Sequence, residues 1–103
     1  SIPDNHIDPG QLTFELYQNY PNPFNKETVI TFFLRQKGPV ELSIFDISGK
    51  LVKNLITGNL DEGEHRVSWN GSRKTGEDLS SGFYFFELKM NGMRQAKKML
   101  LLK

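Results

Sequence analysis

The residues that most often carry chemistry are few in this sequence and are not spaced for it. His6 and His65 are the only histidines, and there is no cysteine. A zinc site needs three or four convergent ligands, and no paired-histidine motif is present. Ser80 and Ser81 have no base beside them in the sequence, as a nucleophilic serine requires. We therefore predict no enzyme activity, no metal centre and no cofactor, and we interpret His65 as a packed or hydrogen-bonded structural residue.

Carboxylates gather in two segments that we expect to be loops. Asp61, Glu62 and Glu64 lie in one of them, and Glu77 and Asp78 lie in the other. Calcium would need several oxygen ligands from these segments to converge, and neither has the spacing of an EF-hand loop. Acidic residues are common in turns for local reasons, because their side chains hydrogen-bond the nearby backbone. Solvated turn residues are therefore the favoured interpretation, and a calcium site is the alternative.

Composition narrows the classes of partner. Thirteen Lys and Arg stand against twelve Asp and Glu, a formal net charge of +1, which is too small for the positive field that attracts nucleic acid. No stretch approaches the roughly 18–20 apolar residues that span a bilayer, so we expect no membrane insertion. A chain of 103 residues is the size of one domain.

The dominant hydrophobic period is two, which is the period of a strand. Ile30, Phe32 and Leu34 share one parity, as do the apolar residues of the segment 40–44. Asn91-Gly92 between two alternating runs is the strongest short hairpin signal. No helical period persists. We therefore predict an all-β fold, an immunoglobulin-like or fibronectin III-like antiparallel sandwich of about seven strands.

The ends of these elements are also predicted. Residues 1–12 combine Pro, Asp, Asn and Gly without a period, which is typical of a linker from an upstream domain, and residues 13–103 form the sandwich. Leu51–Leu55 is expected to be a short strand. A loop then follows from Gly58 to Gly63.

Two groups of residues are more specific than the fold class. In Tyr20–Asn25 two prolines fix the backbone, so we expect a stiff connector whose Tyr20 and Phe24 anchor to the core. The second group is spread along the chain: Trp69-Asn70-Gly71, then Ser81-Gly82 with Tyr84, and finally Lys98–Lys103.

Taken in order, these motifs resemble the first class of C-terminal sorting domains of the type IX secretion system, over roughly residues 14–103. The same pattern is related to the immunoglobulin-like domain of flagellar hook-capping proteins. Lys26 departs from the pattern, where a proline is usual, and so does Gln36. The resemblance implies a structural role for the motif residues Tyr20, Pro21, Asn22, Pro23, Phe24, Asn25, Trp69, Asn70, Gly71, Ser81, Gly82 and Tyr84.

The resemblance also implies a function. Such a domain directs an attached passenger protein from the periplasm of a Gram-negative cell across the outer membrane, to the cell surface or the medium. Its partners are translocon components and the upstream passenger. The recognition element would be Lys97, Lys98, Met99, Leu100, Leu101, Leu102 and Lys103. The alternative is an accessory module of a secreted multidomain enzyme that binds polysaccharide or protein.

Two surface features leave alternatives open. Phe33, Phe45, Phe83 and Phe85 have the parity opposite to the core, so they form an exposed aromatic face or are covered by loops and neighbouring domains. The lysines of the last strand either serve recognition or block edge-to-edge aggregation.

Overall fold

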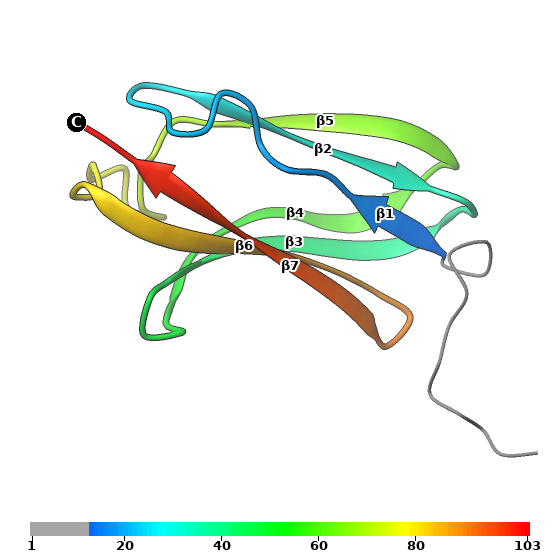
Figure 1. Ribbon diagram of the computed structural model, residues 1–103. Coiled ribbons are helices and arrows are strands. Elements are labelled where there is room, and N and C mark those ends of the chain that lie inside the picture. Colours follow the sequence, from blue (N-terminus) through cyan, green and yellow to red (C-terminus); the bar gives the residue numbers. More distant parts are fainter. Residues whose placement is uncertain (1–12) are drawn as a thin grey trace, which may run out of the picture.

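The computed structural model describes residues 13–103, so the predicted linker and His6 lie outside the described part. Every regular element in this part is a strand, as Figure 1 shows. Across residues 13–103 there is no helix long and apolar enough to cross a membrane. The strands are β1 Phe14–Leu16, β2 Thr28–Leu34, β3 Gly38–Asp46, β4 Leu51–Leu60, β5 Gly63–Trp69, β6 Gly82–Met90 and β7 Met93–Leu101.

The strands form two antiparallel sheets that face each other. One has the order β1-β2-β5 and the other has the order β4-β3-β6-β7. The predicted fold class, an all-β immunoglobulin-like sandwich of seven strands, is confirmed.

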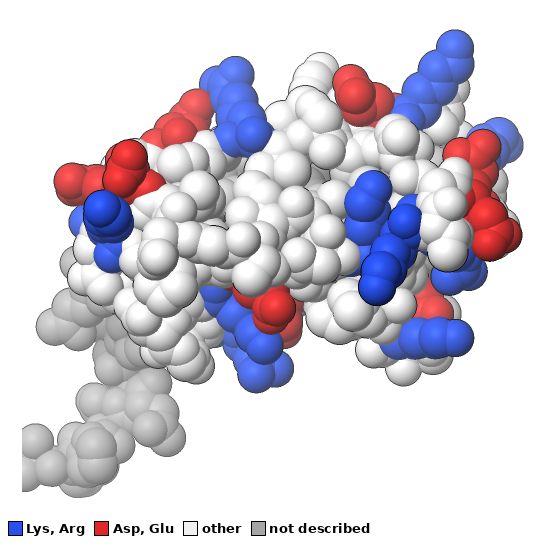
Figure 2. Space-filling view, turned by 180° about the vertical axis from the view of Figure 1, so that it is seen from behind, with Lys and Arg blue, Asp and Glu red and all other residues white. Residues whose placement is uncertain are grey.

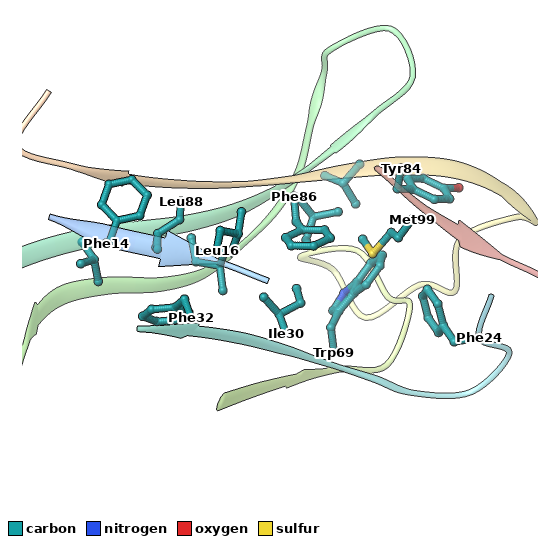
Figure 3. Packing of buried hydrophobic residues seen from close by; sticks show 14 of the residues in the cluster. Phe14, Leu16, Phe24, Ile30, Phe32, Trp69, Tyr84, Phe86, Leu88 and Met99 are labelled. Carbon is teal, nitrogen blue, oxygen red and sulfur yellow. The ribbon is translucent and has the colours of Figure 1, made fainter. Parts of the chain in front are cut away.

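The core lies between the sheets and follows the predicted parity. Ile30, Phe32 and Leu34 of β2 are fully buried, and Val40, Leu42 and Ile44 of β3 are buried in the other sheet. In Figure 3 the side chains of Ile30 and Phe32 point toward those of Phe86 and Leu88 across this interior. Each such side chain contributes about 1.5–3 kcal/mol when removed from water, so this alternation is the main cause of the fold.

Strand β4 is longer than the sequence indicates. It continues to Leu60, because Gly58 and Asn59 pair with Val40 and Pro39 of β3, and only two residues separate it from β5. The predicted loop was therefore wrong over its first half. Gly and Asn disfavour strands, but pairing with a neighbouring strand overrides this weak preference.

Irregular pairing changes one side chain's environment. The β3–β4 register shifts between Leu42 and Ser43, and Ser43 is buried although its parity predicted exposure. The Asn54 amide donates to the Ser43 hydroxyl over 3.0 Å and satisfies it there. A polar residue is tolerated at this position because it has a hydrogen-bond partner.

Two turns have the geometry that their residues favour. Asn91 and Gly92 have φ of 51° and 80°, which matches the expected β6–β7 hairpin. In the β3–β4 turn, the Asp46 carboxylate accepts hydrogen bonds from the Ser48 hydroxyl at 2.6 Å and from the Lys50 N–H at 3.0 Å. The Ser48 hydroxyl foremost, followed by the Lys50 N–H, lowers the pKa of Asp46.

Candidate functional site

The Tyr20–Asn25 connector is hydrogen-bonded to the outer edge of β7. The Phe24 N–H donates to the Leu100 carbonyl at 3.1 Å, and the Leu102 N–H donates to the Phe24 carbonyl at 2.8 Å. The Asn22 side-chain oxygen accepts from the Leu100 N–H at 3.0 Å. Two motifs separated by more than seventy residues therefore form one structure, in which Phe24 pairs with Leu101 as an isolated parallel bridge.

Side chains cover more of the same edge. The Gln18 amide donates to the Lys98 carbonyl at 2.8 Å. The Gln95 side chain donates to the Phe14 carbonyl at 3.0 Å and accepts from the Leu16 N–H at 3.1 Å. An edge strand with open backbone groups is a template for pairing with another chain. At Lys98, Leu100 and Leu102 backbone groups that face outward already have partners within this chain.

Aromatic residues from three motifs pack together beneath this edge. The Trp69 ring lies 5.7 Å from the Phe24 ring and 6.2 Å, edge to face, from the Tyr84 ring. All three are buried, and Figure 3 shows them side by side. The Trp69 Nε1–H donates to the Ser72 carbonyl at 3.0 Å, and the Tyr84 hydroxyl donates to the Ser80 carbonyl at 2.8 Å. We call this end of the sandwich the motif end.

The turn after Trp69 supports the cluster. Gly71 has a φ of 76°, a conformation that glycine adopts readily, and a Cβ added there would lie 3.5 Å from Leu101 and 3.8 Å from Phe24. The Asn70 side-chain oxygen accepts from the Ser72 N–H at 3.2 Å. The turn thus packs directly on the connector and on the terminal strand.

The last residue is tied to the start of β6. The Ser81 hydroxyl, just before Gly82, accepts from the Lys103 N–H at 2.9 Å, and the Lys103 ammonium lies 3.7 Å from an Asp78 carboxylate oxygen. The Lys98 ammonium lies 4.7 Å from the centre of the Phe83 ring, a cation–π geometry. These contacts bring three more motif residues to the motif end.

Only part of the predicted recognition element faces outward. Met99 and Leu101 are fully buried, and Lys97 and Leu100 are half-buried. Lys98, Leu102 and Lys103 are exposed. A partner that docks on the intact fold therefore reaches the exposed side chains of Lys98, Leu102 and Lys103, while Met99 and Leu101 belong to the core.

Tyr20 differs from the expectation that it anchors to the core. Its ring is 80% exposed, whereas Phe24 is buried as expected. The Tyr20 N–H donates to the Val29 carbonyl, and the Tyr20 carbonyl accepts from the Val29 N–H, at 3.0 and 2.9 Å. This pairing fixes the backbone with the ring turned away from an interior that Phe24 and Trp69 fill.

The four phenylalanines lie on the outer sides of two different sheets, so only some of them can belong to one aromatic patch. Phe33 lies in β2, on the outer side of one sheet, while Phe45 and Phe85 are direct cross-strand partners in the other sheet. These three are half-buried, and Phe83 is 44% exposed. Phe45 and Phe85 line a hollow of about 300 Å³ with Gly49, Glu87, Arg94 and Ala96.

The candidate chemical groups do not converge. The His65 Nε2–H donates to the Asp61 carbonyl at 2.7 Å, and the His65 ring stacks on Phe32, with ring centres 5.4 Å apart. The Asp61 loop precedes Gly63, opposite Leu34, while the Asp78 loop follows Trp69 at the other end. Between residues 13 and 103 no three His, Cys, Asp or Glu side chains are close enough to hold a metal ion.

The structure also contains a hollow lined by basic residues that the sequence did not predict. Lys53, Arg73 and Lys74 line a space of about 400 Å³ together with Leu51, Val52, Asn54 and Thr75. The Lys74 N–H lies 3.4 Å from the Val52 carbonyl, so the loop before β6 packs against the edge of β4. The pair Arg73-Lys74 was visible in the sequence, but its approach to Lys53 depends on this long-range contact.

Solved structures with a similar fold were found, although none of the curated proteins matches the chain. Dimeric latent PorU from Porphyromonas gingivalis superposes with a TM-score of 0.70 and 22% identity, over 86% of this chain and 9% of that one. PorZ from the same organism gives 0.60 and 20%, over 85% and 11%. FlgD from Xanthomonas campestris gives 0.60 and 19%, over 85% and 64%. The chain thus spans about a tenth of PorU and PorZ, and these similarities show a shared fold.

Membership of a family rests on the sequence. The family model described as the FlgD Ig-like domain matches residues 23–93, which is more than half of the chain. This match includes the Phe24 end of the connector, the Trp69–Gly71 turn and β6, and it ends at Met93, the first residue of β7. The chain therefore belongs to the family of FlgD Ig-like domains.

Proposed function

We propose that this chain is a sorting module that directs an attached upstream protein across the outer membrane through the type IX secretion system. The observation that carries the proposal is the convergence of the motifs on the terminal strand. The connector bonds to Leu100 and Leu102, Ser81 bonds to Lys103, and Gly71 packs on Leu101. The similarity to PorZ, described as a surface component of that system, supports the same assignment.

In this function the domain acts by shape. Outer-membrane translocon components would recognise the folded sandwich, with the outward side chains of Lys97–Lys103 as one recognition element. The protein would pass through the periplasm and finish at the cell surface or outside the cell. No bond is made or broken by the domain itself, and polysaccharide is not required as a ligand.

The test separates the signal from the fold. A reporter fused before the full chain is expressed in a bacterium with a type IX system, and extracellular and periplasmic amounts are compared. The substitutions Lys98→Glu and Lys103→Glu change the surface of the terminal strand and keep Met99 and Leu101 in the core. We expect export to fall at least tenfold while circular dichroism and thermal unfolding stay close to those of the parent. Equal export of both forms would remove the case for this element.

One observation favours a second function, an accessory binding module. Phe45 and Phe85 face outward as a pair, and the exposed Phe83 follows on the same side of β6. Aromatic side chains can stack on sugar rings. Titration with soluble and insoluble glycans tests this, and retention that Phe85→Ser abolishes would place this function first.

A further inference from the structure

The outer face of the β1-β2-β5 sheet, the upper layer in Figure 1, carries a line of aromatic side chains. In β2 buried residues alternate with half-buried ones, and the half-buried set, Val29, Thr31 and Phe33, faces outward. Residues directly opposite in an antiparallel pair lie on the same face. Tyr20 pairs with Val29, and the Tyr17 N–H donates to the Thr31 carbonyl at 3.0 Å, one residue beyond the β1–β2 register. Each of three successive outward positions along β2 therefore has one aromatic ring beside it or in it.

The two tyrosine rings of this line are accessible. Tyr20 is 80% exposed and Tyr17 is 43% exposed, while Phe33 is half-buried. The partners of the tyrosines in β2 are two residues apart, which separates the tyrosines by about 7 Å along the strand. Gln18 is turned aside, because its amide donates to the Lys98 carbonyl at 2.8 Å. The tyrosines are therefore neighbours on one open face.

Hydrogen bonds hold both tyrosines in place. The Tyr17 hydroxyl donates to one Glu15 carboxylate oxygen at 2.7 Å, and the Arg35 guanidinium donates to the other at 2.8 Å. The Tyr17 hydroxyl foremost, followed by Arg35, lowers the pKa of Glu15, and the same bond to Glu15 raises the pKa of Tyr17. The Tyr20 backbone exchanges two hydrogen bonds with Val29, at 3.0 and 2.9 Å. A ligand that lies on this face does not have to order these segments first, which removes one of the costs of binding.

The charges on this face balance. Glu15 pairs with Arg35 at 2.8 Å, and Glu64 pairs with Arg66 at 3.0 Å. The second pair comes from β5, whose residues lie beside the outward residues of β2. Figure 2 shows Lys or Arg beside Asp or Glu at several places on the side seen from behind, and the net charge of the chain is only +1. Paired charges of opposite sign attract an ionic ligand weakly, so this face suits an uncharged one.

Polar side chains lie in the same rows as the rings. Thr31 lies between Tyr17 and Arg66, and Ser68 lies in the row of Tyr20. The Arg66 guanidinium has five N–H donors, of which its ion pair uses the Nε–H. A sugar chain presents apolar ring faces next to hydroxyl groups, and it would match this alternation of aromatic and polar side chains. The anchors of a protein partner would be expected in a packed apolar pocket instead.

The phenylalanines of the other sheet present less open ring surface. Phe45 and Phe85 are half-buried. The Lys98 ammonium lies 4.7 Å from the centre of the Phe83 ring and covers one of its faces. Because stacking on a sugar requires an open ring face, the tyrosines are better placed for it.

We propose that the outer face of the β1-β2-β5 sheet binds a chain of neutral polysaccharide. Sugar rings stack on Tyr17 and Tyr20, and the Arg66 guanidinium and the Glu15 carboxylate bond to sugar hydroxyls. The sugar chain runs along β2, because the aromatic rings follow one another in that direction. The inference goes beyond the sorting function and does not depend on it. It also places sugar binding on a different sheet from the phenylalanine pair of the second function.

Binding of the full chain to a panel of polysaccharides tests the inference. Xyloglucan, mixed-linkage β-glucan, galactomannan, xylan and amylose are used in affinity electrophoresis, and cellulose and chitin are used in depletion assays. Alginate and polygalacturonate are the anionic comparison. We expect binding to at least one neutral member, more tightly than to either anionic one. Absence of binding to every neutral member would overturn the inference, and so would a preference for the anionic members that added salt removes.

Variants locate the binding face. Each anchor lost typically weakens binding about tenfold, so Tyr20→Ser should cost about tenfold and Tyr17→Ser with Tyr20→Ser more. Tyr17→Phe with Tyr20→Phe keeps both rings and should stay within about threefold, and Phe85→Ser on the other sheet should stay within about twofold. Thermal unfolding checks that each variant is folded, which the exposure of both tyrosines favours. A loss in Phe85→Ser while the double serine variant still binds would move the sugar site to the other sheet.

Export of the reporter fusion separates this inference from the sorting function and from docking of a protein. The variant Tyr17→Ser, Tyr20→Ser should lose glycan binding and be exported like the parent, since the sugar takes no part in export. If this variant instead keeps glycan binding but stays in the periplasm, the face docks a protein and the inference is wrong. If Lys98→Glu with Lys103→Glu leaves export unchanged, the sorting proposal loses its recognition element, and glycan binding through the tyrosines is unaffected.

Discussion

Alanine substitution of the two aromatic residues of the Tyr20–Asn25 connector should destabilise the domain strongly at Phe24 and hardly at all at Tyr20. Phe24 is buried against Trp69 at a ring distance of 5.7 Å, so Phe24→Ala removes a core side chain and leaves a cavity, at a cost of about 3–5 kcal/mol. The Tyr20 ring is 80% exposed and no hydrogen bond of its hydroxyl to another residue of 13–103 is present, so Tyr20→Ala should stay within about 0.5 kcal/mol.

Unfolding in urea, followed by Trp69 fluorescence, measures both changes. For a domain of this size each kcal/mol shifts the thermal midpoint by roughly 4–8 °C, so Phe24→Ala should lower it by at least about 12 °C. In urea, an unchanged m-value, the slope of the unfolding free energy against urea concentration, would assign the loss to stability. A lower m-value would indicate that the connector has left β7 in the native state. Equal losses in the two variants, or an unchanged midpoint for Phe24→Ala, would refute the packing described above.

Three further predictions concern single contacts. Gly71→Ala should cost about 1–2 kcal/mol because of its positive φ rather than through a clash, and Gly71→Asn should cost less; thermal unfolding of the two variants checks this. Asn22→Ala removes the acceptor of the Leu100 N–H, so hydrogen exchange at that amide should accelerate selectively, as NMR can show. The pKa of Asp46 is lowered, first by the Ser48 hydroxyl, so its contribution to stability is present above the unfolded value of about 3.8 and is lost as the pH falls through the lower folded value. NMR titration of that carboxyl should give a value below 3.8, and Asp46→Asn should flatten the acid limb of the stability curve.

The sequence predicts those parts of the structure that depend on local period and local turn chemistry. Ile30, Phe32 and Leu34 are buried because alternation fixes the face of a strand, and Asn91-Gly92 forms a hairpin because both residues accept positive φ. The length of β4 was not predictable in this way, because pairing with β3 extends it through residues that disfavour strands.

The candidate site depends mainly on contacts between distant segments. The Asn22–Leu100 hydrogen bond joins residues 78 positions apart, and no periodicity within either segment indicates it. The outward turn of Tyr20 likewise follows from pairing with Val29 and from the space that Trp69 already occupies. The order of motifs along the chain indicated a family, whereas their convergence on β7 became visible only in three dimensions.

This convergence changes how a truncation of the terminal strand is interpreted. Removing Lys98–Lys103 would delete Met99 and Leu101, which are buried, and would leave Phe24 without its two backbone partners on β7. The truncated domain should therefore unfold, and its failure to be exported would not distinguish a lost signal from a lost fold. Lys98→Glu with Lys103→Glu leaves those core and backbone contacts in place. If this variant folds like the parent but stays in the periplasm, the outward side chains of the strand are read directly; if only the truncation blocks export, the strand acts by completing the sandwich.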